Sequence, residues 1–261
     1  MAIEDILGLL VPLCFFAMLA IEAFGGGRRW PDVRLWRWKG LGFFAVLLAI
    51  NIALPGLLPA DLAARSLFAG RRLGVFGGIV VGFAALTLAT ALLHRAYHRF
   101  DVLWRWVHQL HHSPPRLDVA GSVLFTPLEM VLNVAVFQLV EVVILGIEPI
   151  AAAAVGAIAA FYAMFQHLNV ATPRWLGYLI QRPESHCVHH RLGHHGYNYA
   201  DLPVWDMLSG TFRNPGTFLG EVGFEGEAAM RIAPMLVGRD ANAALYGPGS
   251  RGSRDRQANP A

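Results

Sequence analysis

Long apolar runs separated by short polar segments dominate the first two thirds of the chain. A helix needs about 20 apolar residues to cross the hydrocarbon core of a bilayer. Five segments approach or reach that length: Ile6 to Phe24, Leu41 to Leu58, Gly74 to Leu93, Val123 to Ile147 and Pro149 to Phe165. The last two follow each other closely and predict a tight helical hairpin. We therefore expect an all-α protein, a polytopic membrane helical bundle with four or five transmembrane helices.

Composition supports a membrane protein and argues against nucleic-acid binding. Of 261 residues, 55% are hydrophobic and 15% charged, and the mean hydropathy is +0.45, which is too apolar for an ordinary soluble domain. The basic residues lie in short segments beside the apolar runs and form no long basic tract, so nucleic acid is not an expected partner.

Basic residues mark the cytoplasmic side of a membrane. They crowd the loop after the first apolar run: Arg28, Arg29, Arg34, Arg37 and Lys39. Counting crossings from that loop places residues 94–118, and all residues after Phe165, in the cytoplasm as well. Lys39 is the single lysine among 21 basic residues, an imbalance typical of GC-rich bacterial genes. We therefore predict an integral protein of the bacterial inner membrane, whose start is a membrane helix and not a cleaved signal peptide.

All eleven histidines lie between His94 and His195, mostly in the boxes HRAYH, HQLHH and HCVHH. On a helix, residues i and i+4 share a face, whereas adjacent residues diverge by about 100°, so an HxxHH box can serve two metals. Nine histidines come to one membrane face and are the predicted ligands: His94, His98, His108, His111, His112, His167, His186, His189 and His190.

A single HxxxH pair arises by chance about as often as it binds metal, but three boxes on one membrane face are a specific signal. Nine imidazoles exceed the four ligands of a tetrahedral zinc site, so we predict two metals at this membrane face. Imidazole suits iron, zinc or copper, which leaves the metal open. Cys14 and Cys187 form no Cys-x-x-Cys pair, so the expected ligands are nitrogen and oxygen atoms.

The order of the boxes resembles the fatty acid hydroxylase and sterol desaturase superfamily of membrane di-iron oxygenases. The resemblance covers roughly residues 74–215 and includes three dipeptides after the last box: Asn198-Tyr199, Trp205-Asp206 and Gly210-Thr211. It implies a four-helix membrane core with a cytosolic, histidine-rich, metal-binding cap. The cap would hold two iron ions, with zinc as an alternative on isolation.

The same resemblance implies a reaction. O2 as co-substrate would serve to hydroxylate or desaturate a fatty acyl chain, a sterol or another apolar lipid taken from the bilayer, or to cleave an ether. Electrons would come from a separate donor protein, either a ferredoxin, a cytochrome b5 or a reductase. Relatives carry Arg-x-His-Pro after the second box where this chain has Leu124-Phe125-Thr126-Pro127, and Ala200 and Ser209 also depart from the pattern. These departures bear on substrate more than on metal binding.

Further residues near the boxes are candidates for extra ligands or for hydrogen bonds that orient the ligands: Glu129, His194, His195, Asn198, Asp201 and Asp206. An ionisable group within a membrane segment is costly and indicates function, and carboxylates often orient metal-bound histidines. Glu129 fits both rules. Ordinary turn and capping chemistry is the alternative for the aspartates, and a solvated loop is the alternative for His194 and His195.

Three tryptophans, Trp104, Trp106 and Trp205, predict a belt at the membrane interface. We divide the chain into N-terminal membrane helices (1–73), a catalytic domain (74–215), a cytosolic C-terminal segment (216–245) and a disordered tail (246–261), because the tail has little to bury.

The main alternative function is a histidine-rich membrane metal transporter or sensor. It requires polar residues along a membrane path, where the sequence offers Glu129 and Glu141. A haem protein with two imidazole ligands would need histidines at matched depth in facing helices. A zinc hydrolase of the HExxH type lacks its motif in this sequence.

Overall fold

The computed structural model describes residues 3–25, 27–57, 59 and 66–241. Helices form nearly all of the regular structure in these ranges, which contain no strand, although one antiparallel bridge joins Arg191 to Val222. The all-α prediction is therefore confirmed.

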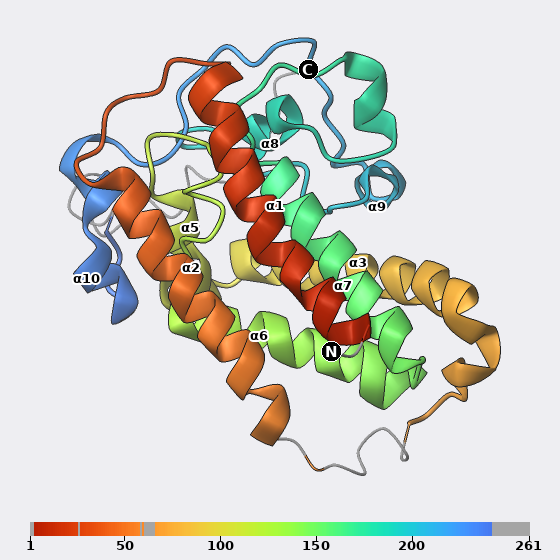
Figure 1. Ribbon diagram of the computed structural model, residues 1–261. Coiled ribbons are helices and arrows are strands. Elements are labelled where there is room, and N and C mark those ends of the chain that lie inside the picture. The colour runs from red at the N-terminus through yellow and green to blue at the C-terminus, as the bar shows by residue number, and fades with distance from the viewer. Residues whose placement is uncertain (1–2, 26, 58, 60–65, 242–261) are drawn as a thin grey trace.

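Four helical segments are long and apolar enough to cross a membrane. They are α1 (Ile3–Gly25), α2 (Trp36–Ala53) with the 3-10 turn η1 (Pro55–Leu57), α3 (Gly74–Arg99) with the turn η3 (Gly70–Leu73), and α6 (Pro127–Phe137) with the π-helix η5 (Gln138–Leu145). A shorter apolar helix, α7 (Pro149–Phe165), contacts both α1 and α3 (Figure 1). The chain is thus an integral membrane protein with four or five spans, as predicted.

The second span begins earlier than its apolar run. α2 begins at Trp36, before the predicted Leu41, and Trp36 is buried with Ala120 and Leu124 of the loop after the second histidine box. Pro55 follows the last turn of α2 and does not bend it, which agrees with the missing backbone N–H of proline. Leu58, the predicted end of this run, lies outside the described residues.

The fourth span starts at Pro127 and not at the predicted Val123, which lies buried in the preceding loop. Thr126 caps the helix, because its hydroxyl accepts from the backbone N–H of Glu129 over 3.1 Å. A threonine cap followed by proline is a favourable helix start, and it fixes Glu129 in the first turn.

The spans place the arginine-bearing loop after α1 at the same end of the bundle as the histidine segments. Gly27 N–H donates to the carbonyl of Asn169, just beyond α7, over 3.0 Å. Glu22, near the end of α1, accepts from the backbone N–H groups of Asn169 and Val119 over 2.8 and 3.0 Å. This agrees with the predicted arrangement, while the compartment into which this end faces stays a prediction.

Close contacts between small and aromatic residues hold the bundle together. Phe15 of α1 stacks on Phe44 of α2 with ring centroids 4.0 Å apart. A Cβ on Gly40 would lie 2.7 Å from the carbonyl oxygen of Ala120, so α2 touches the backbone of the loop that follows the second histidine box. Only glycine fits at this contact.

The cap consists of short helices and loops at the histidine end. They are α4 (Asp101–Leu103), the π-helix η4 (Trp104–His108), α5 (Gln109–His112), η6 (Arg174–Tyr178), α8 (Pro183–His189), α9 (Pro203–Leu208), η7 (Gly226–Met230) and α10 (Ile232–Leu236). Figure 1 shows α8 near the end of α1, with α9 and α10 at opposite edges of the cap.

The segment after residue 215 covers the second histidine box. Phe224 and Met235 are buried with Leu110 of α5, and the Gln109 side chain donates to the carbonyl of Arg239 over 2.8 Å. The end of the predicted C-terminal segment (242–245) and the predicted tail (246–261) lie outside the described residues, and the predicted domain boundaries stay predictions.

Candidate metal centre

The structure gathers all nine predicted ligand histidines into two adjacent groups. Within each group the potential ligand nitrogens lie within 4.8 Å of one another. The five-histidine group contains His94, His98, His108, His112 and His189, and the four-histidine group contains His111, His167, His186 and His190. Each group could hold one metal ion.

Both HxxHH boxes contribute to both groups. In each box the two histidines four positions apart share a group, and the histidine between them joins the other group. The boxes divide as His108 with His112 against His111, and His186 with His190 against His189. Adjacent residues on a helix point about 100° apart, so this division agrees with the predicted service of two metals by one box.

Local helix geometry differs among the boxes. The first box continues α3 beyond the apolar run, as predicted, so His94 and His98 lie one turn apart. The second box begins in the π-helix η4, whose wider turn ends at His108. Short π-helical segments occur often at functional sites, and the spacing of the sequence letters gives no sign of this one.

In two rings of the five-histidine group, a backbone carbonyl determines which ring nitrogen carries the proton. His94 Nδ1 donates to the carbonyl of Tyr199, and His189 Nδ1 donates to the carbonyl of Tyr197, each over 2.7 Å. A neutral imidazole has a single N–H, so the Nε2 atom of each ring carries a lone pair. His189 Nε2 is buried without a hydrogen-bond partner among the described residues.

His108 is oriented by a carboxylate. Its Nδ1 donates to Oε1 of Glu129 over 2.6 Å, and both side chains are buried. This places Glu129 where the sequence predicted an orienting role. The bond leaves the Nε2 atom of His108 with a lone pair, as for His94.

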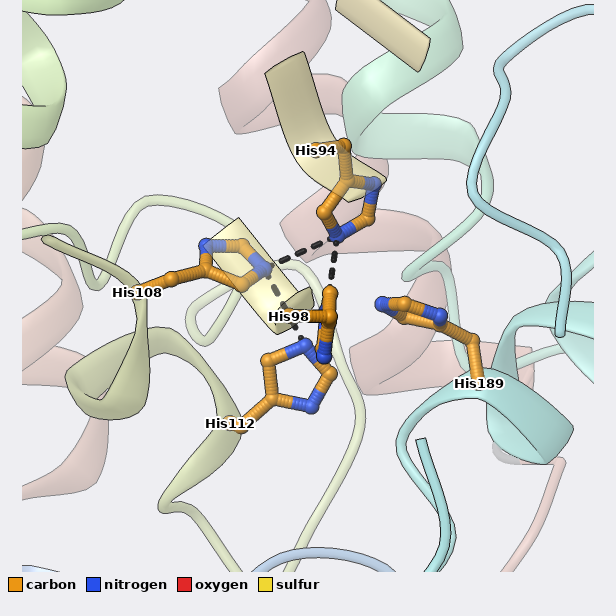
Figure 2. A group of neighbouring side chains, drawn as sticks. All are labelled: His94, His98, His108, His112 and His189. Atoms are coloured by element: carbon orange, nitrogen blue, oxygen red, sulfur yellow. Dashed lines mark hydrogen bonds between the residues drawn. The ribbon is translucent and has the colours of Figure 1, made fainter. Parts of the chain in front are cut away.

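The Nε2 atoms of His94 and His108 are 2.8 Å apart. When His94 Nδ1 donates to Tyr199 and His108 Nδ1 donates to an ionised Glu129, neither Nε2 can donate a hydrogen bond to the other. Two lone pairs at this distance repel each other, and a cation within reach of both would relieve the repulsion. Figure 2 shows the five rings turned towards a common space, with this contact dashed. The donor set therefore fits a metal ion.

The four-histidine group repeats this chemistry. His167 Nδ1 donates to the carbonyl of Ala163 over 2.7 Å, which leaves its Nε2 as an acceptor. That atom lies 3.2 Å from Nε2 of both His111 and His186, and His190 Nε2 lies 3.1 Å from His186 Nε2. All four side chains are buried.

Burial keeps these imidazoles neutral. Desolvation lowers the pKa of His108, His112 and His189 well below the usual value, and repulsion from neighbouring histidines lowers it further. Desolvation lowers the pKa of His167 to about 4. Neutral imidazole is the metal-binding form.

Asp206 holds the backbone that orients His94. Its carboxylate accepts from the N–H groups of Tyr199 and Ala200 over 3.0 and 2.8 Å, and Arg95 lies 3.3 Å from it. The carbonyl of Tyr199, fixed in this way, is the acceptor of His94. Asp206 therefore acts on the ring through the backbone.

Asn198 and Asp201 support loops rather than histidine rings. The Asn198 side chain donates to the carbonyl of Ser185 in α8 over 2.8 Å, and its backbone adopts φ 55°. Asp201 accepts from Gln166 at the end of α7 over 3.0 Å. A ligand role for either residue stays a prediction.

His194 and His195 lie outside both groups. The ring of His194 packs against Tyr197 with centroids 5.3 Å apart. The ring of His195 lies closer to the centre, 4.7 Å from that of His112, and its Nδ1 is 3.2 Å from the carbonyl of His189.

Trp104 does not belong to an interfacial belt, contrary to the prediction. It is buried, and its ring centroid lies 5.2 and 5.3 Å from those of His98 and His112. The π-helix η4 turns it inward. The orienting roles of Tyr197 and Tyr199 were not predicted from the sequence, because these residues act through backbone carbonyl groups, which every residue has.

Comparisons with known proteins agree with this geometry. Residues 79–211, which include all nine histidines, match the family model described as fatty acid hydroxylase. The ornithine lipid hydroxylase OlsE of Rhizobium tropici is 32% identical over 141 residues, covering 52% of this chain and 42% of that protein. The match thus spans less than half the length of this relative. No solved structure matches the chain.

Proposed function

Because residues 79–211, half of the chain, match its model, the chain belongs to the fatty acid hydroxylase family, and we propose that it is a membrane-bound, O2-dependent lipid hydroxylase with a histidine-ligated di-iron centre. Hydroxylation places one oxygen atom of O2 in a C–H bond and releases the other as water. The balance requires two electrons and two protons from a separate donor such as a ferredoxin, a cytochrome b5 or a reductase.

The observation that carries the proposal is the pair of lone pairs on His94 and His108, 2.8 Å apart. Nine histidine nitrogens in two groups, seven of them from buried residues, support two metals, and imidazole donors suit iron. Neither group supplies six nitrogens, so open positions for O2 would remain. Two iron ions bound there would activate O2 for attack on an unactivated C–H bond.

The protein's own residues would orient the ligand imidazoles and exclude water from the metal centre. Tyr199, Tyr197 and Glu129 hold the Nδ1 protons of three rings, which keeps each Nε2 aimed at its metal. Burial of the four-histidine group keeps water away and preserves neutral imidazole.

The substrate we propose is a membrane lipid, which would reach the centre sideways from the bilayer. The name of the relative favours a lipid with an amino-acid headgroup, such as an ornithine lipid. We also propose that the cap faces the cytoplasm of a bacterial inner membrane, since the arginine-bearing loop after α1 lies at the histidine end.

The test is lipid oxidation by the purified full chain in lipid nanodiscs. Iron-loaded protein with O2, a ferredoxin and its reductase should add one labelled atom of oxygen-18 gas to an ornithine lipid. His111→Ala should abolish the product. His194→Ala, outside both groups, is the matched control and should retain it.

Two outcomes would contradict the proposal: purified protein that binds no transition metal, or undiminished lipid oxidation by His111→Ala. An alkene product without added oxygen would indicate desaturation instead. Metal uptake into vesicles without oxidation would favour a transporter, although the buried residues of α6 between Glu129 and Glu141 include the apolar Met130 and Val134.

A further inference from the structure

We propose that one face of the cap is inserted into the bilayer leaflet that surrounds the histidine end of the bundle. This η6–α9 face consists of Trp175, Tyr178, Leu179, Val204, Met207 and Leu208. The proposal concerns the depth of the cap in the membrane and does not depend on the oxidation chemistry.

The η6–α9 face exposes large apolar side chains. Leu208 is 76% exposed, Trp175 63% and Leu179 62%. On α9 the polar Asp206 is buried, so this short helix turns its carboxylate inward and its apolar side chains outward. Soluble surfaces seldom carry such a patch without a partner.

A hydrogen bond fixes the depth of α9. The indole of Trp205 donates to the hydroxyl of Thr87 over 3.0 Å, and Thr87 lies near the middle of the apolar span Gly70–Arg99. Thr87 precedes His94 by seven residues, which is about 10 Å along an α-helix. α9 is therefore attached to α3 on the membrane side of the metal centre.

A second set of bonds continues this attachment. Arg95 of α3 donates to the hydroxyls of Ser209, directly after α9, and Thr211, the latter over 2.6 Å. α9 thus follows α3 from Thr87 towards Arg95. Leu92, between these two positions, is 60% exposed, so the lipid-facing surface of α3 continues onto α9.

The chemistry of η6 suits the boundary between hydrocarbon and headgroups. Tryptophan and tyrosine are enriched at that level, because each combines an apolar ring with a polar atom. η6 contacts α9, and the Tyr178 ring lies 5.7 Å from that of Phe212, just beyond α9. Figure 1 shows α9 at the edge of the cap and not above the end of α1. The bilayer is therefore the occupant that this face fits.

The experiment is a depth measurement by spin labelling. A nitroxide is attached to Leu208→Cys in a Cys14→Ser background, and the full metal-loaded chain is placed in vesicles of phosphatidylethanolamine and phosphatidylglycerol. Collisions with O2, which is enriched in lipid, are compared with collisions with a water-soluble nickel chelate. The matched control is Leu219→Cys, an 86% exposed leucine beside residues that bond Arg28 of the α1 loop.

We expect the ratio of O2 to nickel accessibility to be severalfold higher at position 208 than at position 219. Equal ratios, or a label at 208 that prefers nickel, would overturn the proposal. Dipolar broadening between labels at 208 would show that a second copy covers the face, which also overturns it. Val204→Cys serves as a second label site if Leu208→Cys fails to fold, and retained metal content reports folding independently of any lipid product.

Discussion

The Nδ1 atom of His108 donates to Glu129 over 2.6 Å, between two side chains that are both buried. This is the one direct bond in the centre between a histidine of the two groups and a carboxylate among the described residues, and it joins the second histidine box to the fourth span. We therefore expect Glu129→Ala to weaken metal binding by about 10–100-fold, the usual effect of losing an orienting partner.

Glu129→Gln should lose less metal affinity than Glu129→Ala, because its amide oxygen still accepts from His108 Nδ1. The measurement is metal retained after dialysis against graded chelator, with thermal unfolding as a check of folding. Wild-type retention by a folded Glu129→Ala protein would show that the carboxylate does not orient the ring.

The two groups should respond differently to ligand removal. His190→Ala leaves three nitrogens in its group, whereas His98→Ala leaves four in the other. We expect His190→Ala to lower the metal content from about two ions per chain towards one, and His98→Ala to lower it less. Metal analysis of purified protein checks this, with His194→Ala as the control. Equal losses in both variants would contradict the division into two groups.

Without metal, the stability of the folded protein should decrease as the pH falls below neutral. Burial lowers the folded-state pKa of His108 and His112 well below the usual value, and that of His167 to about 4. The folded state thus favours neutral rings, so their contribution is complete above about pH 6.5 and is lost as the pH falls towards the folded pKa values. Chelator-treated protein should melt at a lower temperature at pH 5 than at pH 7.5. A higher melting temperature at pH 5 would refute the assignment of neutral rings.

Asp206 should matter for both stability and metal binding. Asp206→Ala removes the acceptor of the Tyr199 and Ala200 N–H groups. The cost is about 1–3 kcal/mol for the buried N–H of Ala200, and the change releases the carbonyl that orients His94. Asp206→Asn keeps one acceptor oxygen and should restore part of both properties. Denaturant unfolding and metal content are measured together. Full metal retention by Asp206→Ala would assign this residue to folding alone.

Two neighbouring glycines of α2 provide a packing test. A Cβ at Gly40 would lie 2.7 Å from the backbone of Ala120, whereas one at Gly42 would meet nothing within 4 Å. Alanine favours a helix over glycine by about 1 kcal/mol at either position. Gly42→Ala should therefore raise the melting temperature, and Gly40→Ala should lower it, because overpacking costs about 1–3 kcal/mol. A rise in both variants would disprove the contact.

The spans and the histidine clusters follow from local patterns. An apolar run predicts a membrane helix without any knowledge of tertiary contacts, because its length and composition suffice. The i, i+4 spacing likewise predicts which histidines of a box share a face. The structure groups His108 with His112 on this basis. The apolar pattern did not predict the start of α6, because Val123 is as apolar as the helix that follows it. The N-cap residue Thr126 sets the boundary.

Features that depend on tertiary contacts were not predictable. Trp104 looks like an interfacial residue, and only the π-helical turn and its contacts place it against His98. The orienting carbonyls of Tyr197 and Tyr199 leave no trace in residue type. The Thr87 hydroxyl, one of many small polar groups in apolar runs, becomes informative only when Trp205 is seen to bond it.

Each HxxHH box supplies both groups from consecutive turns of one short helical segment, and this has a consequence for tolerated changes in chain length. One residue inserted between His108 and His111 would rotate the pair that follows by about 100° and remove rings from both groups at once. Insertions or deletions within a box are thus excluded, whereas a change of length in the irregular segment between α5 and α6 leaves the register within each box intact. Homologous proteins should therefore keep the spacing within each HxxHH box, even where the segments between the boxes differ in length.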